Sequence, residues 1–191
     1  MAKVALHFSM SLDGFIAGPN ISRETPMGEG GMRLHEWMFN EPKNAIDTEA
    51  VREIFASVGA VVLGKRTFDL GIGEWHDVPF PAPSFVVTHH ARAPLAQKSG
   101  TFTFVDDGIE GAILRARVAA GDKNVVVMGA DVAQQALKAG LADELVLQIV
   151  PVLMDEGIRL FERLGAENIE LELLRQTQSP NVMHLRYRVL K

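Results

Sequence analysis

The chain has 191 residues, of which 47% are hydrophobic and 23% charged, so it suits one globular domain with a substantial core. It contains no cysteine, which excludes disulfides, thiolate metal sites and a cysteine nucleophile and is compatible with a reducing compartment. The net charge of −5 gives no support for non-specific nucleic-acid binding, which needs a basic face. No segment approaches the ~18–20 apolar residues of a membrane span, and the N-terminal apolar run is too short for a signal peptide. We therefore expect a cytoplasmic protein whose partner is a small molecule and neither nucleic acid nor a membrane.

The residue pattern in the first third of the chain predicts one strand, a long loop and two helices. The expected elements are a strand over 3–10, a loop over 11–31 and helices over 32–39 and 47–58. The loop contains five glycines and two prolines, and loops of this length in compact domains are usually functional or disordered. The second helix has Asp47 or Thr48 as a candidate N-cap. Its apolar face consists of Val51, Ile54, Phe55 and Val58.

The rest of the chain alternates between strand and helix and then changes character. Strands are expected over 60–64, 84–88, 101–105, 124–129 and 144–150, and helices over 65–71, 108–121 and 130–140, the last with a left-handed stop at Gly140. At the C-terminal end, two alternating segments, 169–178 and 182–190, flank a Pro–Asn turn and predict an antiparallel hairpin. The pattern predicts a single α/β domain, residues 1–191, with a mainly parallel sheet and the hairpin at its edge.

The strand that ends at Gly64 runs into a helix whose first residues are Lys65, Arg66 and Thr67. In an open α/β sheet, ligands bind beyond the carboxyl ends of the strands. Exposed backbone N–H groups and the helix dipole favour an anion at such a helix start, and the two cations strengthen that preference. The alternative is that Gly64 only ends the strand while both cations are solvated.

A second strand delivers Gly129 into a tight turn, and a helix begins at once. Because Gly129 has no Cβ, a ligand can approach the backbone closely, and Gln134 or Gln135 can add hydrogen bonds. The alternative is an ordinary strand–helix turn with Asp131 as its N-cap, and the charge of Asp131 would repel a phosphate. The full glycine fingerprint of a dinucleotide-binding fold is absent from the sequence.

A third group of polar residues follows the strand over 84–88 and comprises Thr88, His89, His90 and Arg92. Charge-assisted hydrogen bonds from such side chains suit a 2′-phosphate. Adjacent histidines also suggest a metal, but neighbours on an extended segment point to opposite faces, so we expect no metal site. The alternative is a plain solvated loop.

Asp13 and Gly14 follow the first strand, where a carboxylate can orient a polar substrate or assist a proton transfer. The alternative is an Asp–Gly turn with a purely structural role. On the helix that follows, Trp37 can stack on a flat ring, although an aromatic residue at helical spacing is more often part of the core.

Taken in order, the segments SLDGFIAG, VVLGKRTFD, FVVTHH and VVVMGADVAQQALKAG resemble those of the dihydrofolate-reductase-like superfamily. They are most similar to the C-terminal reductase domain of the bacterial bifunctional riboflavin deaminase-reductase (the RibD C-terminal domain) and its stand-alone relatives. The resemblance covers nearly the whole chain. It implies a three-layer fold with a mostly parallel sheet of about eight strands and NADPH as the hydride donor.

The resemblance also implies roles for individual residues. The cofactor would contact Ile16, Gly64, Lys65, Arg66, Thr67, Thr88, His89, Gly129, Ala130, Asp131 and Val132. The substrate side would include Asp13 as the catalytic residue, together with Gly14, Glu36 and Trp37. This chain departs from the family pattern in two places. Ala130 stands for the second glycine of a paired turn, and Asp155 and Glu156 stand where relatives often carry glycines.

The function that these features predict is an NADPH-dependent reductase acting on a pterin- or aminopyrimidine-like heterocycle. A non-catalytic nucleotide-binding module is the main alternative, and a protein whose fold serves dimerisation only is a third. We also expect a homodimer, because relatives in the family usually pair and the C-terminal strands offer apolar side chains at a sheet edge. Those side chains are Leu171, Leu173, Val189 and Leu190.

Overall fold

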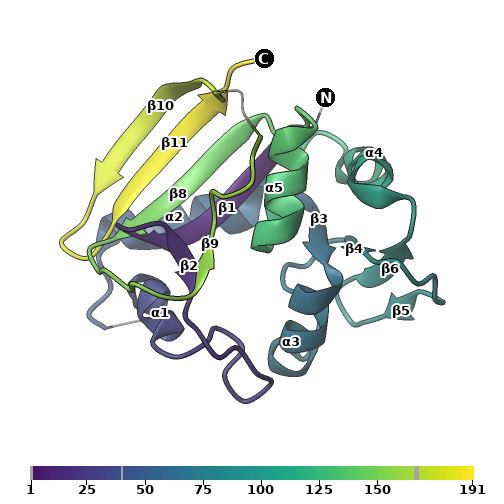
Figure 1. The fold of residues 1–191 in the computed structure, drawn as a ribbon, viewed down its shortest axis with the longest axis horizontal. Coiled ribbons are helices and arrows are strands. Elements are labelled where there is room, and N and C mark those ends of the chain that lie inside the picture. Colours follow the sequence, from purple (N-terminus) through teal and green to yellow (C-terminus); the bar gives the residue numbers. More distant parts are fainter. Residues whose placement is uncertain (1, 40, 166–167) are drawn as a thin grey trace.

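The computed structural model describes residues 2–39, 41–165 and 168–191. Within these residues, a nine-stranded sheet has the order β10–β11–β8–β1–β7–β3–β4–β6–β5, and β2 and β9 form a separate small sheet (Figure 1). The strands are β1 (Val4–Ser11), β2 (Phe15–Ala17), β3 (Val58–Gly64), β4 (Ser84–Val87), β5 (Leu95–Ala96), β6 (Thr101–Val105), β7 (Asn124–Met128), β8 (Glu144–Val150), β9 (Ile158–Arg159), β10 (Leu171–Gln178) and β11 (Met183–Val189). The helices are α1 (Glu36–Phe39), α2 (Ala45–Ser57), α3 (Lys65–Trp75), α4 (Gly108–Ala120) and α5 (Ala130–Lys138), with a 3₁₀ turn over Gly31–Leu34 before α1.

The six central strands, from β8 to β6 in the sheet order, run parallel to one another. The hairpin β10–β11 is antiparallel at one edge, and the two-residue β5 is antiparallel at the other. The predicted parallel sheet with a C-terminal antiparallel hairpin is therefore confirmed. The resemblance implied about eight strands, whereas the main sheet of the described residues has nine. One of the nine, β5, has two residues and is too short to leave a periodic signal in the sequence.

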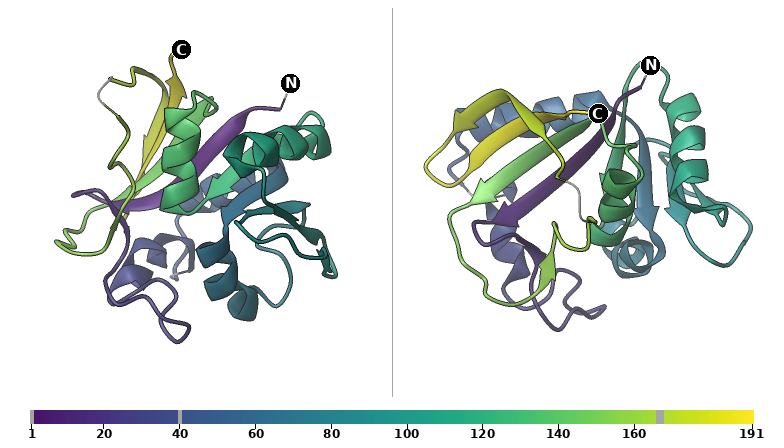
Figure 2. Two further views of the ribbon diagram at one scale, coloured as in Figure 1. Left: turned by 45° about the vertical axis from the view of Figure 1, so that its right-hand side comes forward. Right: turned by 45° about the horizontal axis from the view of Figure 1, so that its top comes forward.

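Helices cover both faces of the sheet, which explains why strands such as β7 are continuous apolar runs. The larger core packs α4 and α5 against one face of β1, β3 and β7. A second core packs Phe68 of α3 against the opposite face, around Leu63 and Val86. In Figures 1 and 2, α2 lies behind β8 and β1, on the side of the sheet away from α5. No helix in the described part of the chain combines the length and the apolar character that a membrane crossing needs.

Three local predictions need correction. The helix expected over 32–39 is divided into the 3₁₀ turn and the four-residue α1. Neither Asp47 nor Thr48 caps α2, because Asn44 does: its Oδ1 accepts the N–H of Ile46 at 2.8 Å. The apolar face predicted for α2 is only partly buried, since Phe55 is 45% exposed and Val58 belongs to β3.

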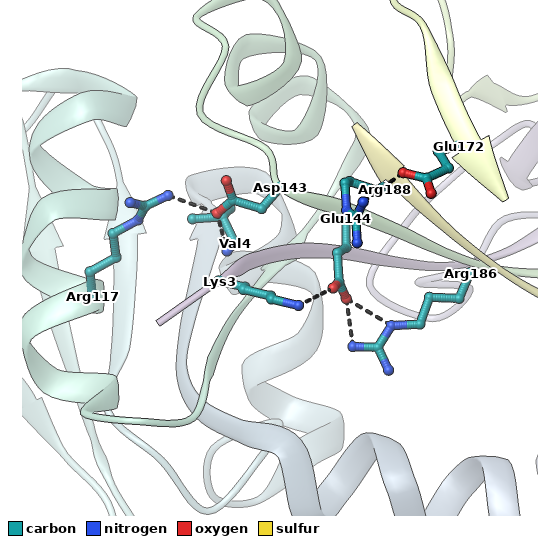
Figure 3. A network of polar contacts seen from close by, with 8 residues as sticks. All are labelled: Lys3, Val4, Arg117, Asp143, Glu144, Glu172, Arg186 and Arg188. Carbon is teal, nitrogen blue, oxygen red and sulfur yellow. Dashed lines mark hydrogen bonds and ion pairs between the residues drawn. The ribbon is translucent and has the colours of Figure 1, made fainter. Parts of the chain in front are cut away.

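A network of ion pairs ties the amino ends of the strands together (Figure 3). The buried carboxylate of Glu144 pairs with Lys3 at 2.7 Å and with Arg186 at 2.6 Å. The neighbouring Asp143 pairs with Arg117 of α4 at 2.8 Å. This end of the sheet is therefore closed by structural contacts, and the opposite, carboxyl edge is the one where ligands bind in open α/β sheets.

Candidate cofactor and active site

The predicted site segments meet at the carboxyl edge of the sheet. In the strand register, Gly64 is paired with Val87, and Ser11 with Val150, while Leu63 next to Gly64 is paired with Met128. Because these strands are parallel and adjacent, the turns that follow them lie at one edge. The structure thus brings together polar groups that are far apart in the sequence.

The first turn of α3 and the turn before α5 are in direct contact. Gly129 has φ +96°, and a Cβ at this position would lie 2.5 Å from Oγ1 of Thr67. Gly64 differs, since its φ of −78° suits any residue and a Cβ there would make only an ordinary contact with Val132 at 3.5 Å. Gly129 is therefore required by its backbone conformation and by the close approach of Thr67.

Neither α3 nor α5 has a side chain that caps its N-terminus. The first turn of α3 has no acidic residue, whereas that of α5 contains Asp131. Asp131 does not cap α5, and its carboxylate accepts a hydrogen bond from Gln135 at 2.7 Å. The N-terminus of α3 is consequently the better position for an anion.

Cations from two segments converge beside α3. The ammonium of Lys65 lies 5.9 Å from the ring centre of Phe68 and donates to Asp69 at 2.6 Å. The guanidinium of Arg92 lies 5.8 Å from the same ring and 4.3 Å from that of Phe104. These stacking contacts hold the loop after β4 close to the start of α3.

Thr88 and His89 have different environments within that loop. Thr88 is buried, and its Oγ1 accepts the N–H of His90 at 3.2 Å, so it shapes the turn. His89 and His90 are exposed, as is Arg66 on α3. The exposed side chains are therefore the ones that can reach an anionic ligand in solution.

The carboxylate of Asp13 binds the loop that follows β8. It accepts the backbone N–H groups of Met154 at 3.0 Å and Asp155 at 2.8 Å. The Ser11 hydroxyl and these backbone groups lower the pKa of Asp13 to about 2. Asp13 is thus ionised at neutral pH, so it cannot act as a proton donor there, although it can still orient a ligand. Asp155 has φ +66°, a left-handed conformation that favours glycine and that Asp tolerates.

The loop carrying Asp13 is also fastened to α5. Arg159 of β9 donates to the backbone oxygen of Asp13 at 2.9 Å and stacks on the ring of Phe15 at 4.2 Å. Gln134 of α5 donates to the backbone oxygens of Arg159 and Leu160 at 3.2 and 3.1 Å. The side chain of Gln134 is therefore engaged within the protein, and so is that of Gln135. Gly14, between β1 and β2, has φ +93°, and Ile16 of β2 is buried.

The two helix residues expected near the substrate differ in exposure. Trp37 is 6% exposed, and its Nε1 donates to Oγ of Ser9 at 3.0 Å, so it belongs to the core, as the alternative interpretation has it. The side chain of Glu36 is 44% exposed and pairs with Arg33 at 3.3 Å.

A buried Asp–His pair near the carboxyl edge of the sheet was not predicted from the sequence. Oδ1 of Asp47 lies 2.8 Å from Nε2 of His184, and both residues are buried. The ring of Trp37 meets that of His184 edge-on, with centroids 5.0 Å apart. The alternation of β11 places a histidine on the face that meets α2, but nothing local distinguishes it from a solvated one.

Fold and site together define a class: this is an α/β protein with the dihydrofolate-reductase-like fold. A dihydrofolate reductase from Enterococcus faecalis, complexed with NADP(H), has a TM-score of 0.57 and 14% identity, covering 99% of this chain and 97% of that one. A protein from Shewanella sp. PV-4 that is named for riboflavin biosynthesis has a TM-score of 0.77 and 21% identity over the whole of both chains. A pyrimidine reductase-like protein from Corynebacterium diphtheriae has a TM-score of 0.67 and 14% identity, covering all of this chain and 92% of that one.

The family follows from the sequence comparison. The model of the RibD C-terminal domain matches residues 2–185, so the chain belongs to the RibD C-terminal domain family. The chain is also 23% identical to the uncharacterized protein YwjB of Bacillus subtilis over 185 residues, which is 97% of either protein. The resemblance stated from the four sequence segments is therefore confirmed.

Proposed function

We propose that the protein is an NADPH-dependent reductase that transfers hydride to a C=N or C=O carbon of a pterin- or aminopyrimidine-like heterocycle. The observation that carries this proposal is the contact between Gly129 and Thr67. It joins two helix N-termini that have no side-chain caps, beside a cluster of cations. Membership of the RibD C-terminal domain family supports it, as do the NADP(H) of one structural relative and the reductase name of another.

The residues present fit a phosphorylated dinucleotide. The N–H groups at the start of α3, with Lys65 and Arg66, are suited to the phosphates, and the absence of a Cβ at Gly129 leaves the backbone approachable. Exposed His89 and stacked Arg92 are suited to a 2′-phosphate. When bound, NADPH supplies the hydride, and the protein contributes binding, orientation and exclusion of water.

On the substrate side, we assign Asp13 an orienting role. Its ionised carboxylate is fixed by backbone N–H groups of the loop after β8, and a lone pair that remains can accept an N–H from a heterocycle. Because its pKa is low, the proton that completes the reduction comes from water and not from Asp13.

A non-catalytic nucleotide-binding module is the second candidate. Ala130 and Asp131 favour it, because a Cβ and a negative charge follow Gly129 where the family pattern has a second glycine. A protein of this kind would bind NADPH but would not oxidise it in the presence of any heterocycle.

Titration of the purified protein with NADPH and NADH, followed by nicotinamide fluorescence, tests the proposal. We expect NADPH to bind at least about tenfold more tightly, a difference of ~1.4 kcal/mol that one or two partly screened charge-assisted contacts can supply. His89→Ala should reduce this preference, because His89 is assigned to the 2′-phosphate that only NADPH has, whereas Arg115→Ala, on the surface of α4, should not. Equal affinities for the two cofactors would refute the assignment of the 2′-phosphate site. Oxidation of NADPH with pterins and aminopyrimidines then separates the two candidate functions.

A further inference from the structure

The half of the sheet that lies under α2 has an unusually polar face. The strand register places Ser9, Gln148 and His184 in one row across β1, β8 and β11, and His7 lies in the next row of the same face with Arg186. Strands of a parallel sheet with helices on both sides are normally apolar on both faces. Here only the opposite face follows that rule, and it packs in the larger core.

A hollow of about 80 Å³ lies between this polar face and α2. That volume has room for several water molecules or for a small ring, since one water needs only ~10–15 Å³ by a comparable measure. The charged side chains around it are paired, Arg175 with Glu53 at 2.8 Å and Arg186 with Glu144 at 2.6 Å. The lining therefore offers little net charge and many hydrogen-bonding groups.

The strongest pointer to a ligand is His184, which lines the hollow and is 8% exposed. Its Nε2 contacts Asp47, but its Nδ1 is buried without any hydrogen-bond partner among the described residues. Because the carboxylate of Asp47 can only accept at Nε2, we assign the tautomer that carries its proton on Nε2 and leaves Nδ1 as the acceptor. Asp47 and the edge contact with Trp37 then hold Nδ1 as a fixed acceptor.

One further group in the hollow also has no partner among the described residues. Nδ1 of His7 is buried and unpaired among the described residues. Burial, with the charge of Arg186, lowers the pKa of His7 to about 4, so the His7 ring is neutral. Gln148, which is 4% exposed, lies beside His184 in the same row of the sheet. Buried polar groups in folded proteins are nearly always satisfied, so these groups indicate a missing partner.

We propose that the hollow under α2 binds an uncharged ring bearing N–H donors, and that His184 is the specificity-determining residue that accepts one of them. This inference rests on the proposed function for the class of ring, and it assigns the ring a pocket. The row of His184 lies two residues before the strand ends at Ser11 and Val150, a distance of about 7 Å along the strands. A ring held there would extend toward the edge where Asp13 lies.

The test compares uracil with 1,3-dimethyluracil, which keeps both carbonyl oxygens but has no N–H donor. Binding is followed by protein NMR without NADPH, so that failure of the cofactor assignment does not affect it. We expect uracil to perturb resonances of Gln148, His184 and Ile54 and to bind at least about tenfold more tightly than its dimethyl derivative, equivalent to ~1.4 kcal/mol. Equal binding of both rings, no binding, or shifts confined to other surfaces would overturn the proposal.

A protein variant separates hydrogen bonding from the bulk of the two methyl groups. In the double variant Asp47→Asn/His184→Phe, which avoids an unpaired buried carboxylate, the preference for uracil should disappear. The control is His76→Asn, at an exposed histidine outside both the hollow and the proposed cofactor site, and this variant should keep the preference. If the double variant folds and still prefers uracil, the preference is steric and His184 has no such role. NADPH titration of the same samples shows independently whether the proposed function stands.

Discussion

Substituting Gly129 by alanine tests the contact on which the proposed cofactor site depends. Gly129 has φ +96° and ψ 138°, a conformation that residues with a Cβ rarely adopt. The added Cβ would also lie 2.5 Å from Oγ1 of Thr67. Gly140 provides a matched control, since its φ is +65° and a Cβ there would meet nothing within 4 Å.

The expected cost can be worked from these two effects. A residue held in such a backbone conformation costs ~1–3 kcal/mol, and moving Thr67 off its preferred rotamer adds ~1 kcal/mol. Gly129→Ala should therefore lower the free energy of unfolding by ~2–4 kcal/mol. Gly140→Ala, which has only the left-handed strain, should lower it by ~1 kcal/mol. In Gly129→Ala/Thr67→Ala the steric part should be recovered, leaving the backbone part.

Urea unfolding of the four proteins measures these differences, provided that the slope of free energy against urea stays constant. NADPH titration of the same samples should show loss of binding for Gly129→Ala and normal binding for Gly140→Ala. If Gly129→Ala is no less stable than Gly140→Ala, the close approach of Thr67 does not constrain this turn. If it also binds NADPH normally, the turn is not part of the cofactor site.

Three further predictions address the remaining assignments. Asp13→Asn should lower turnover on the accepted heterocycle by ~10²-fold while NADPH affinity stays within about twofold, because the loss concerns substrate orientation; unchanged turnover would make Asp13 structural. The protein should be a dimer by light scattering, and Leu173→Lys on the exposed edge strand β10 should make it monomeric. A monomeric parent protein at micromolar concentration would contradict the predicted homodimer. Because the pKa of His7 falls from 6.5 to about 4 on folding, protonation favours the unfolded chain, and stability should decline as pH falls from about 6.5 to 4. In His7→Asn, the urea midpoint of unfolding should depend less on pH across that window. An unchanged pH dependence would exclude His7 as the cause.

Most of the fold could be predicted because its elements are regular and locally encoded. Parallel strands such as β3 and β7 are apolar on both faces, so each appears as a short continuous run that ends at a glycine. The strands that escaped prediction, β2, β5 and β9, have two or three residues and depend on pairing with a distant segment. The cap of α2 was missed for a similar reason: Asn44, Asp47 and Thr48 are all plausible caps, and only the inward turn of Asp47 toward His184 decides among them.

The candidate site could be predicted only where it is built from turns that follow strands. Lys65, Thr88 and Gly129 are each adjacent to a recognisable strand end, and the parallel topology brings them to one edge. Asp47 and His184 are 137 residues apart, and neither lies in a motif. Their association depends on α2 crossing the polar face of the sheet, which follows from tertiary packing and not from any periodic pattern.

The departures of this chain from its family shift the expected balance between two helix N-termini. At α5, Ala130 adds a Cβ and Asp131 adds a negative charge, so its first turn attracts an anion less than a paired-glycine turn would. At α3, the first turn has no acidic residue and begins with two cations. Lys65 and Arg92 lie 5.9 and 5.8 Å from the ring centre of Phe68. We infer that affinity for the cofactor depends mainly on α3 and on the loop after β4. We expect Asp69 to moderate that affinity, because it pairs with Lys65 and would share Lys65 with a bound phosphate.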